Sequence, residues 1–161
     1  MITHKYWGKI REESAGISPE HRFKIPYFEK KVQVFLGKEL LEDDEKDDLS
    51  KRKLDEFEQT FKAFLASLDA HIITIKTKAF KWYKKLYAHY YEDSSKSGKK
   101  PLNIDSAEKH FAYIKDIIYI RITDKKTLRI IIGYDQIDGD HGLEIKFVAN
   151  KFSKLDSIAE T

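Results

Sequence analysis

Large apolar residues recur at helical spacing between residues 54 and 90, and this double stripe constrains the fold of the 161-residue chain more than any other feature. Intervals of three and four residues are typical of one face of an α-helix. The rhythm breaks near residues 69–71, which predicts two consecutive helices, or one long kinked helix, within residues 49–91. Both stripes need a flat apolar partner. Their members are Leu54, Phe57, Phe61, Phe64, Leu65 and Leu68, then Ile72, Ile75, Ala79, Trp82, Tyr83, Leu86 and Tyr90.

A period of two replaces the helical period towards the C-terminus. Alternating apolar residues predict three strands there, and a weaker fourth strand follows over residues 152–158. Because short turns join these segments, the sequence predicts a four-strand antiparallel meander over residues 116–158. The alternating positions are Ile118, Ile120 and Ile122, then Leu128, Ile130, Ile132 and Tyr134, and finally Leu143, Ile145 and Phe147.

The rest of the chain has weaker patterns. Residues 1–20 are polar and predict an irregular N-terminal arm, which Trp7 would hold against the body of the protein. Two short strand patterns predict a hairpin over residues 21–36, with a proline that only a strand end or edge tolerates. Residues 93–101 have the composition of a linker, and a short capped helix is expected over residues 105–114.

These elements predict a two-layer α+β fold in a single domain of residues 1–161. An antiparallel sheet with one apolar face needs a cover, and the striped helices provide it. The expected sheet consists of the hairpin at 21–36 and the meander at 116–158. The helices of 49–91 and the short helix of 105–114 would cover one face. Whether the hairpin joins the meander or forms a separate sheet is left open by the pattern.

Composition excludes several classes of activity. The chain has no cysteine, which removes disulfides, thiolate nucleophiles and cysteine-ligated metal sites. None of the hydrolase, phosphate-loop or dinucleotide motifs occurs, so we predict no catalytic residues, no cofactor and no enzymatic activity. No apolar run is long enough to span a membrane and no signal peptide is visible, so a cytoplasmic location is the expectation.

The segment 135–142 is the strongest candidate for chemistry. Its three carboxylates and one imidazole could bind a divalent cation in a metal-dependent enzyme. The alternative is a plain hairpin turn, because turns are built from the same residue types, and we favour that interpretation. The candidate metal ligands are Asp135, Asp138, Asp140 and His141.

A lysine-rich face follows on the second helical stripe. Five lysines occur between residues 76 and 85 without an acidic residue, and residues 96–100 add three more. Lysines interleaved with aromatic residues can bind nucleic acid. However, most of these aromatic residues fall on the apolar stripe and should be buried, so a solvated lysine face is the favoured interpretation. The candidate nucleic-acid contacts are Lys76, Lys81, Lys84 and Lys85.

An acidic run precedes the first helix. Residues 42–48 contain six acids and one lysine, a net charge of −5 against +3 for the whole chain. Acidic residues favour the positive end of a helix dipole, which explains the position of the run without any function. The run could also serve as a docking edge for a basic protein. The residues of this candidate partner site are Asp43, Asp44, Asp47 and Asp48.

The paired helices end in Tyr90-Tyr91, and a late turn reads Asp140-His141-Gly142-Leu143. In these motifs the chain resembles an uncharacterised group of bacterial domains of unknown function, which has glutamate before the histidine. The resemblance covers about residues 21–160. It implies immunity-like roles near toxin genes, but no catalytic residues. We therefore predict a non-enzymatic module that binds another protein, such as a toxin or a second copy of itself, and no membrane. A nucleic-acid binder and a metal-dependent enzyme are the less favoured alternatives.

Overall fold

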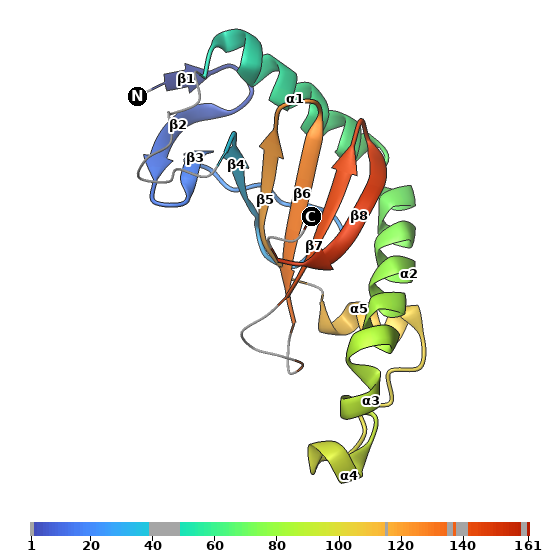
Figure 1. Ribbon diagram of the computed structural model, residues 1–161. Coiled ribbons are helices and arrows are strands. Elements are labelled where there is room, and N and C mark those ends of the chain that lie inside the picture. The colour runs from blue at the N-terminus through green and yellow to red at the C-terminus, as the bar shows by residue number, and fades with distance from the viewer. Residues whose placement is uncertain (1, 39–48, 115, 135–136, 138–141, 159–160) are drawn as a thin grey trace.

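The computed structural model describes residues 2–38, 49–114, 116–134, 137, 142–158 and 161. The protein has the α+β fold that the sequence predicts, with a small three-stranded sheet beside a five-stranded sheet that helices cover on one face (Figure 1).

Residues 2–19 form an antiparallel sheet, so the prediction of an irregular arm was wrong. Its strands are β1 (Ile2–His4), β2 (Gly8–Glu13) and β3 (Gly16–Pro19), in the order β1-β2-β3. Gly8 and Gly16 have positive φ angles of 73° and 139° where β2 and β3 begin. These strands carry few apolar residues, which is why no alternation marks them.

The main sheet has the order β4-β5-β6-β7-β8. The predicted meander is confirmed as β5 (Ile117–Thr123), β6 (Thr127–Gly133), β7 (Gly142–Val148) and β8 (Lys151–Ser157). A register shift between Ile117 and Tyr119 turns Ile118 outward and Ile117 inward, contrary to the predicted alternation. A one-residue slip of this kind reverses which side chains face the core.

The hairpin predicted over 21–36 is largely absent. Its second half is β4 (Gln33–Leu36), but its first half is reduced to one bridge between Phe23 and Val32. Pro26 and the positive φ of 77° at Tyr27 keep the intervening chain from continuing a strand. Instead β4 pairs in parallel with β5, from Gln33–Tyr119 to Leu36–Ile122, which makes the sheet mixed rather than antiparallel.

The helical region consists of α1 (Lys51–Ala66), α2 (Leu68–Leu86), α3 (Ala88–Tyr91), α4 (Ser94–Ser97) and α5 (Ala107–Tyr113). The two stripes are two helices, and the break falls at Ser67. Ser50 caps α1 by accepting from the Lys53 amide, and Ser106 caps α5 by accepting from the Lys109 amide. The predicted linker at 93–101 includes the single turn of α4 (Figure 1).

One cluster of buried apolar side chains extends from Trp7 in the small sheet to Tyr83 in α2. Most stripe residues of α1 and α2 are buried in this cluster together with the inward-facing isoleucines of β5 and β6, and Leu65 is partly buried against it. Leu86 and Tyr90 are exceptions, because these last two members of the second stripe are exposed.

Arg121 joins the small sheet to the uncovered face of the main sheet. Its buried guanidinium donates to the carbonyl of Gly37 at 2.9 Å and to that of Ala15 at 2.7 Å. The same group lies 4.8 Å from the centre of the Phe35 ring. These contacts hold the β2–β3 turn against β4 and β5.

Candidate functional site

Two of the predicted sites lie outside the described residues. They are the acidic positions Asp43, Asp44, Asp47 and Asp48, and the metal candidates Asp135, Asp138, Asp140 and His141. Both sites therefore stay predictions. The residues that border the second segment are described, and Tyr134, Ile137 and Gly142 are all buried.

Gly142 has a clear packing reason to be glycine. A Cβ atom built at this position would lie 2.2 Å from the carbonyl oxygen of Ile132 in the neighbouring strand β6. Gly142 pairs with Gly133, so two glycines face each other where β6 ends and β7 begins. The glycine of the Asp-His-Gly-Leu segment is thus explained by close approach of two strands.

The structure separates the predicted lysine site into two parts. Lys76 lies against α5, where its ammonium pairs with Glu108 at 2.9 Å and lies 5.0 Å from the centre of the Phe111 ring. Lys81, Lys84 and Lys85 are exposed near the other end of α2. Lys76 is therefore a packing residue. The Lys84 ammonium lies 4.6 Å from the centre of the Phe80 ring, and Lys81 and Lys85 are the lysines most available to a partner.

The exposed lysines belong to a larger surface at the end of α2 and in α3, which we call the distal surface. Lys81, Lys85 and His89 follow one another at intervals of four residues. Leu86 and Tyr90 lie beside them, with 41% and 44% of their surface exposed. Helices α3 and α4 extend beyond the sheet at this end of the molecule (Figure 1). We define the distal surface as Lys81, Lys84, Lys85, Leu86, His89 and Tyr90.

Two other aromatic residues of this region are in the core, as predicted, and Phe80, Tyr87 and Tyr91 are partly buried against it. Trp82 and Tyr83 are buried, and the Tyr83 hydroxyl donates to Glu92 at 2.9 Å. Burial and this carboxylate raise the pKa of Tyr83 far above its usual value. Glu92 also accepts from the amide of Ile104, so this acidic side chain is engaged within the fold.

His110 of α5 is fully buried beside Tyr134, which directly follows β6. The His110 Nε2 and the Tyr134 hydroxyl are 2.8 Å apart, and Nδ1 has no hydrogen-bond partner among the described residues. Burial lowers the pKa of His110 from 6.5 to about 4, so the ring is neutral at neutral pH. Burial also raises the pKa of Tyr134 well above its usual value.

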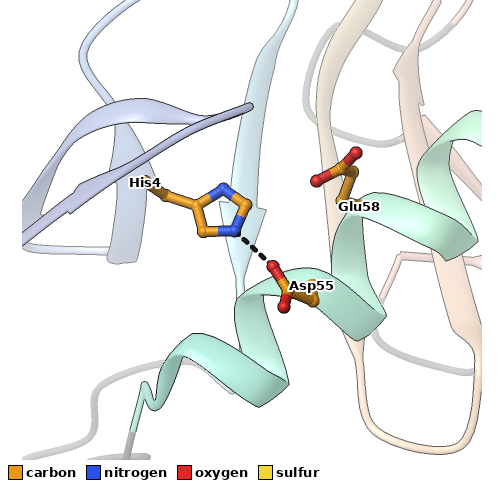
Figure 2. Close-up of side chains that lie close together, drawn as sticks. All are labelled: His4, Asp55 and Glu58. Atoms are coloured by element: carbon orange, nitrogen blue, oxygen red, sulfur yellow. Dashed lines mark hydrogen bonds and ion pairs between the residues drawn. The ribbon is translucent and has the colours of Figure 1, made fainter.

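A second group of titratable side chains, which the sequence did not reveal, joins the small sheet to α1. His4, Asp55 and Glu58 offer ligand atoms within 4.8 Å of one another (Figure 2). His4 lies in β1 and both acids lie in α1, so 51 residues separate the histidine from Asp55. No short-range motif could have predicted this group.

Hydrogen bonds define the role of the His4 group. The Nδ1 atom of His4 accepts from the amides of Tyr6 and Trp7 at 3.1 and 3.3 Å, so the ring proton must be on Nε2. That Nε2 then donates to Asp55 at 2.7 Å and, together with Lys51, lowers the pKa of the carboxyl. Glu58 pairs with Lys62.

The His4 group is therefore a structural clamp rather than a metal centre. A metal ion at Nε2 would displace the proton to Nδ1, where it would face two amide donors. The neighbouring Trp7 indole donates to the carbonyl of Leu54 at 3.0 Å and reinforces the same contact between the small sheet and α1.

Comparisons with family models, with curated proteins and with solved structures found no match for this chain. The resemblance seen in the sequence consequently stays a prediction. Among the helices of the described residues, none has the length and apolar character needed to cross a membrane.

Proposed function

We propose that this protein is a non-enzymatic, cytoplasmic protein-binding module that recruits an acidic protein through the distal surface. The observation that carries the proposal is the exposure of Leu86 and Tyr90 beside the stripe of Lys81, Lys85 and His89. These two side chains continue a stripe whose earlier members are buried. Their exposure leaves apolar surface at the end of α2 and in α3.

The chemistry of the distal surface suits a protein partner. Protein interfaces place aromatic and apolar anchors at the centre and polar residues at the rim. Here Tyr90 and Leu86 would be the anchors, and the lysines would attract acidic groups and speed association. Residues 76–100 contain eight lysines and two acids, and both acids are engaged, Glu92 with Tyr83 and Asp93 with Ser95.

A nucleic-acid partner is supported less well. Binding of single strands relies on several aromatic rings on which successive bases stack. Trp82 and Tyr83 are buried, and Tyr87 and Tyr91 are only partly exposed, which leaves Tyr90 as the exposed ring of the distal surface. The resemblance to immunity-like bacterial proteins adds a class of binding partner to the proposal, namely a toxin with an acidic surface.

Site-specific photo-crosslinking in the native host would test this proposal. A benzoylphenylalanine would replace Tyr90, and the matched control would carry it in place of Ile73, which is 67% exposed elsewhere on α2. We expect one discrete adduct from position 90, sensitive to protease and resistant to nuclease. The double substitution Lys81→Glu with Lys85→Glu should abolish that adduct.

Two results would contradict the proposal. One is a set of adducts common to positions 90 and 73, because it would show that the distal surface has no particular partner. The other is a nuclease-sensitive adduct, which would assign the lysine face to nucleic acid. The separate prediction for Asp43, Asp44, Asp47 and Asp48 can be tested in the same cells, since their neutralisation to asparagine should weaken capture of a basic partner.

A further inference from the structure

A groove of about 570 Å³ opens between α1 and two turns of the main sheet. These turns, β5–β6 and β7–β8, lie at the end of the sheet opposite to α3 and α4 (Figure 1). The volume falls in the range of small-molecule sites, roughly 300–1,000 Å³. The residues that matter below are Glu56, Phe57, Thr60, Lys125, Lys126 and Asn150.

The walls of the groove are held in place by hydrogen bonds. The side chain of Asn150 accepts from His71 Nε2 at 2.7 Å and donates to the Ser67 hydroxyl at 3.1 Å, which ties the β7–β8 turn to the junction of α1 and α2. The amide of Ala149 donates to the carbonyl of Lys126 at 3.1 Å, which joins the two turns to each other. The groove is therefore formed before any ligand arrives.

Both turns have unusual backbone angles. Lys125 and Lys126 have φ angles of 62° and 55°, and Ala149 and Asn150 have 49° and 61°. Glycine and asparagine adopt this left-handed region readily, whereas lysine and alanine do so at a cost of roughly 1 kcal/mol each. Three residues of one groove thus have side chains where glycine would be easier, and such outliers are enriched at ligand sites.

The charges of the groove favour an anion. Its two carboxylates already have cationic partners, Glu56 with Arg52 at 3.4 Å and Asp124 with Lys53 at 3.7 Å. In the part of the chain that the structure describes, Lys125 and Lys126 form no ion pair or hydrogen bond through their ammonium groups. Ala63, which is partly exposed, and Ala149, which is exposed, add apolar surface beside these charged groups.

We infer that this groove binds a small organic anion, in which a carboxylate or phosphate contacts Lys125 and Lys126 and an apolar ring packs against Ala63 and Ala149. Charge-assisted hydrogen bonds from two ammonium groups would hold the anionic end. The polar side chains of Thr60 and Asn150 line the same groove and can accept or donate further bonds. This site is independent of the distal surface and of the proposed protein partner.

The test is a titration of the ¹⁵N-labelled full chain with three probes that share one ring. Benzoate and phenyl phosphate present the two anionic groups, and benzamide is the neutral control. We expect saturable amide shifts at Phe57, Thr60, Lys125 and Asn150 with an anion, at millimolar affinity and without an equal response to benzamide. Saturation by benzoate alone or by phenyl phosphate alone would identify the anionic group.

The variant Lys125→Gln with Lys126→Gln should bind the anion at least about tenfold more weakly, which corresponds to about 1.4 kcal/mol. The matched control, Lys5→Gln with Lys9→Gln, removes the same charge from exposed positions of the small sheet and should bind as the wild type does. Absence of saturable shifts in the groove, equal shifts with benzamide, or unchanged affinity of the Lys125/Lys126 variant would overturn the inference.

Discussion

At the scale of single residues, Gly142 is the glycine at which the neighbouring backbone leaves least room for a side chain. Its φ angle is outside the range that disfavours side chains, so the objection to a larger residue is purely steric. A Cβ atom would overlap the carbonyl oxygen of Ile132, and neither strand can move without disturbing the pairing of β6 and β7.

We therefore expect Gly142→Ala to lower the free energy of unfolding by at least about 2 kcal/mol. Gly98→Ala is the matched control, because Gly98 has a positive φ but no atom near its Cβ position, and it should cost about 1 kcal/mol. Urea unfolding of both variants would measure the difference. Equal costs for the two substitutions would show that the steric account of Gly142 is wrong.

His110 should make the stability of the protein depend on pH. In the unfolded chain the ring takes up a proton near pH 6.5, whereas in the folded protein it does so only near pH 4. Between these values the unfolded state binds more protons, so stability rises with pH across this window and is lost as pH falls. The shift corresponds to about 3 kcal/mol.

We expect His110→Gln to remove this dependence. Urea unfolding at pH 7 and pH 4.5 should show a smaller loss of stability for the variant than for the wild type. His89→Gln, at an exposed histidine, is the control and should behave as the wild type does. A wild-type pH profile in the His110 variant would mean that buried carboxyl groups, rather than this ring, set the acid response.

At the scale of elements, the β5–β6 turn combines a strained backbone with two exposed lysines. Replacing Lys125 by Asn and Lys126 by Gly introduces the residues that favour positive φ. We expect the free energy of unfolding to rise by about 1 kcal/mol, while the anion affinity of the groove falls. Thermal unfolding and the benzoate titration on the same sample would check both. A variant that gained no stability would remove the argument from backbone strain.

Elements with strong periodic patterns were predictable from the sequence, and elements with weak patterns were not. The stripes of α1 and α2 and the meander are marked by bulky apolar residues that recur in step with the structure. Strands β1–β3 carry Ile2, Ile10 and Ile17 among polar residues, so no apolar alternation marks them. The sequence signal for these strands was the pair of glycines at which β2 and β3 begin, because glycine favours the positive φ of a turn.

The sites were less predictable than the elements. His4 meets Asp55, and Lys126 meets Ala149, only because the fold brings distant segments together. Local spacing contains no trace of such contacts. The lysine face was recognised, but its division into the Lys76–Glu108 pair and an exposed distal part depends on where α5 packs against α2.

At the scale of the whole molecule, the two tryptophans report on opposite ends. Trp7 is buried between the small sheet and α1, and Trp82 is buried near the distal end of α2. Because one continuous cluster of buried side chains includes both, we expect the chain to unfold as one cooperative unit.

The variants Trp7→Phe and Trp82→Phe each leave a single fluorescent tryptophan. In each variant the midpoint of urea unfolding followed by fluorescence should coincide with the midpoint followed by far-ultraviolet circular dichroism. A fluorescence midpoint that differs from the circular dichroism midpoint in either variant would show that the two ends unfold separately, and that the chain is not the single domain that the sequence predicts.

The parallel pairing of β4 with β5 also has a consequence for the order of events during synthesis. The partner of Val34 is Ile120, so β4 leaves the ribosome long before the strand that completes it. Contacts between such distant segments slow folding. Until then the apolar side chains of Val34 and Leu36 are without their neighbours in the sheet, and an unpaired strand of this kind is prone to aggregate. A nascent chain stalled before residue 117 should therefore be the form of this protein that depends most on chaperones.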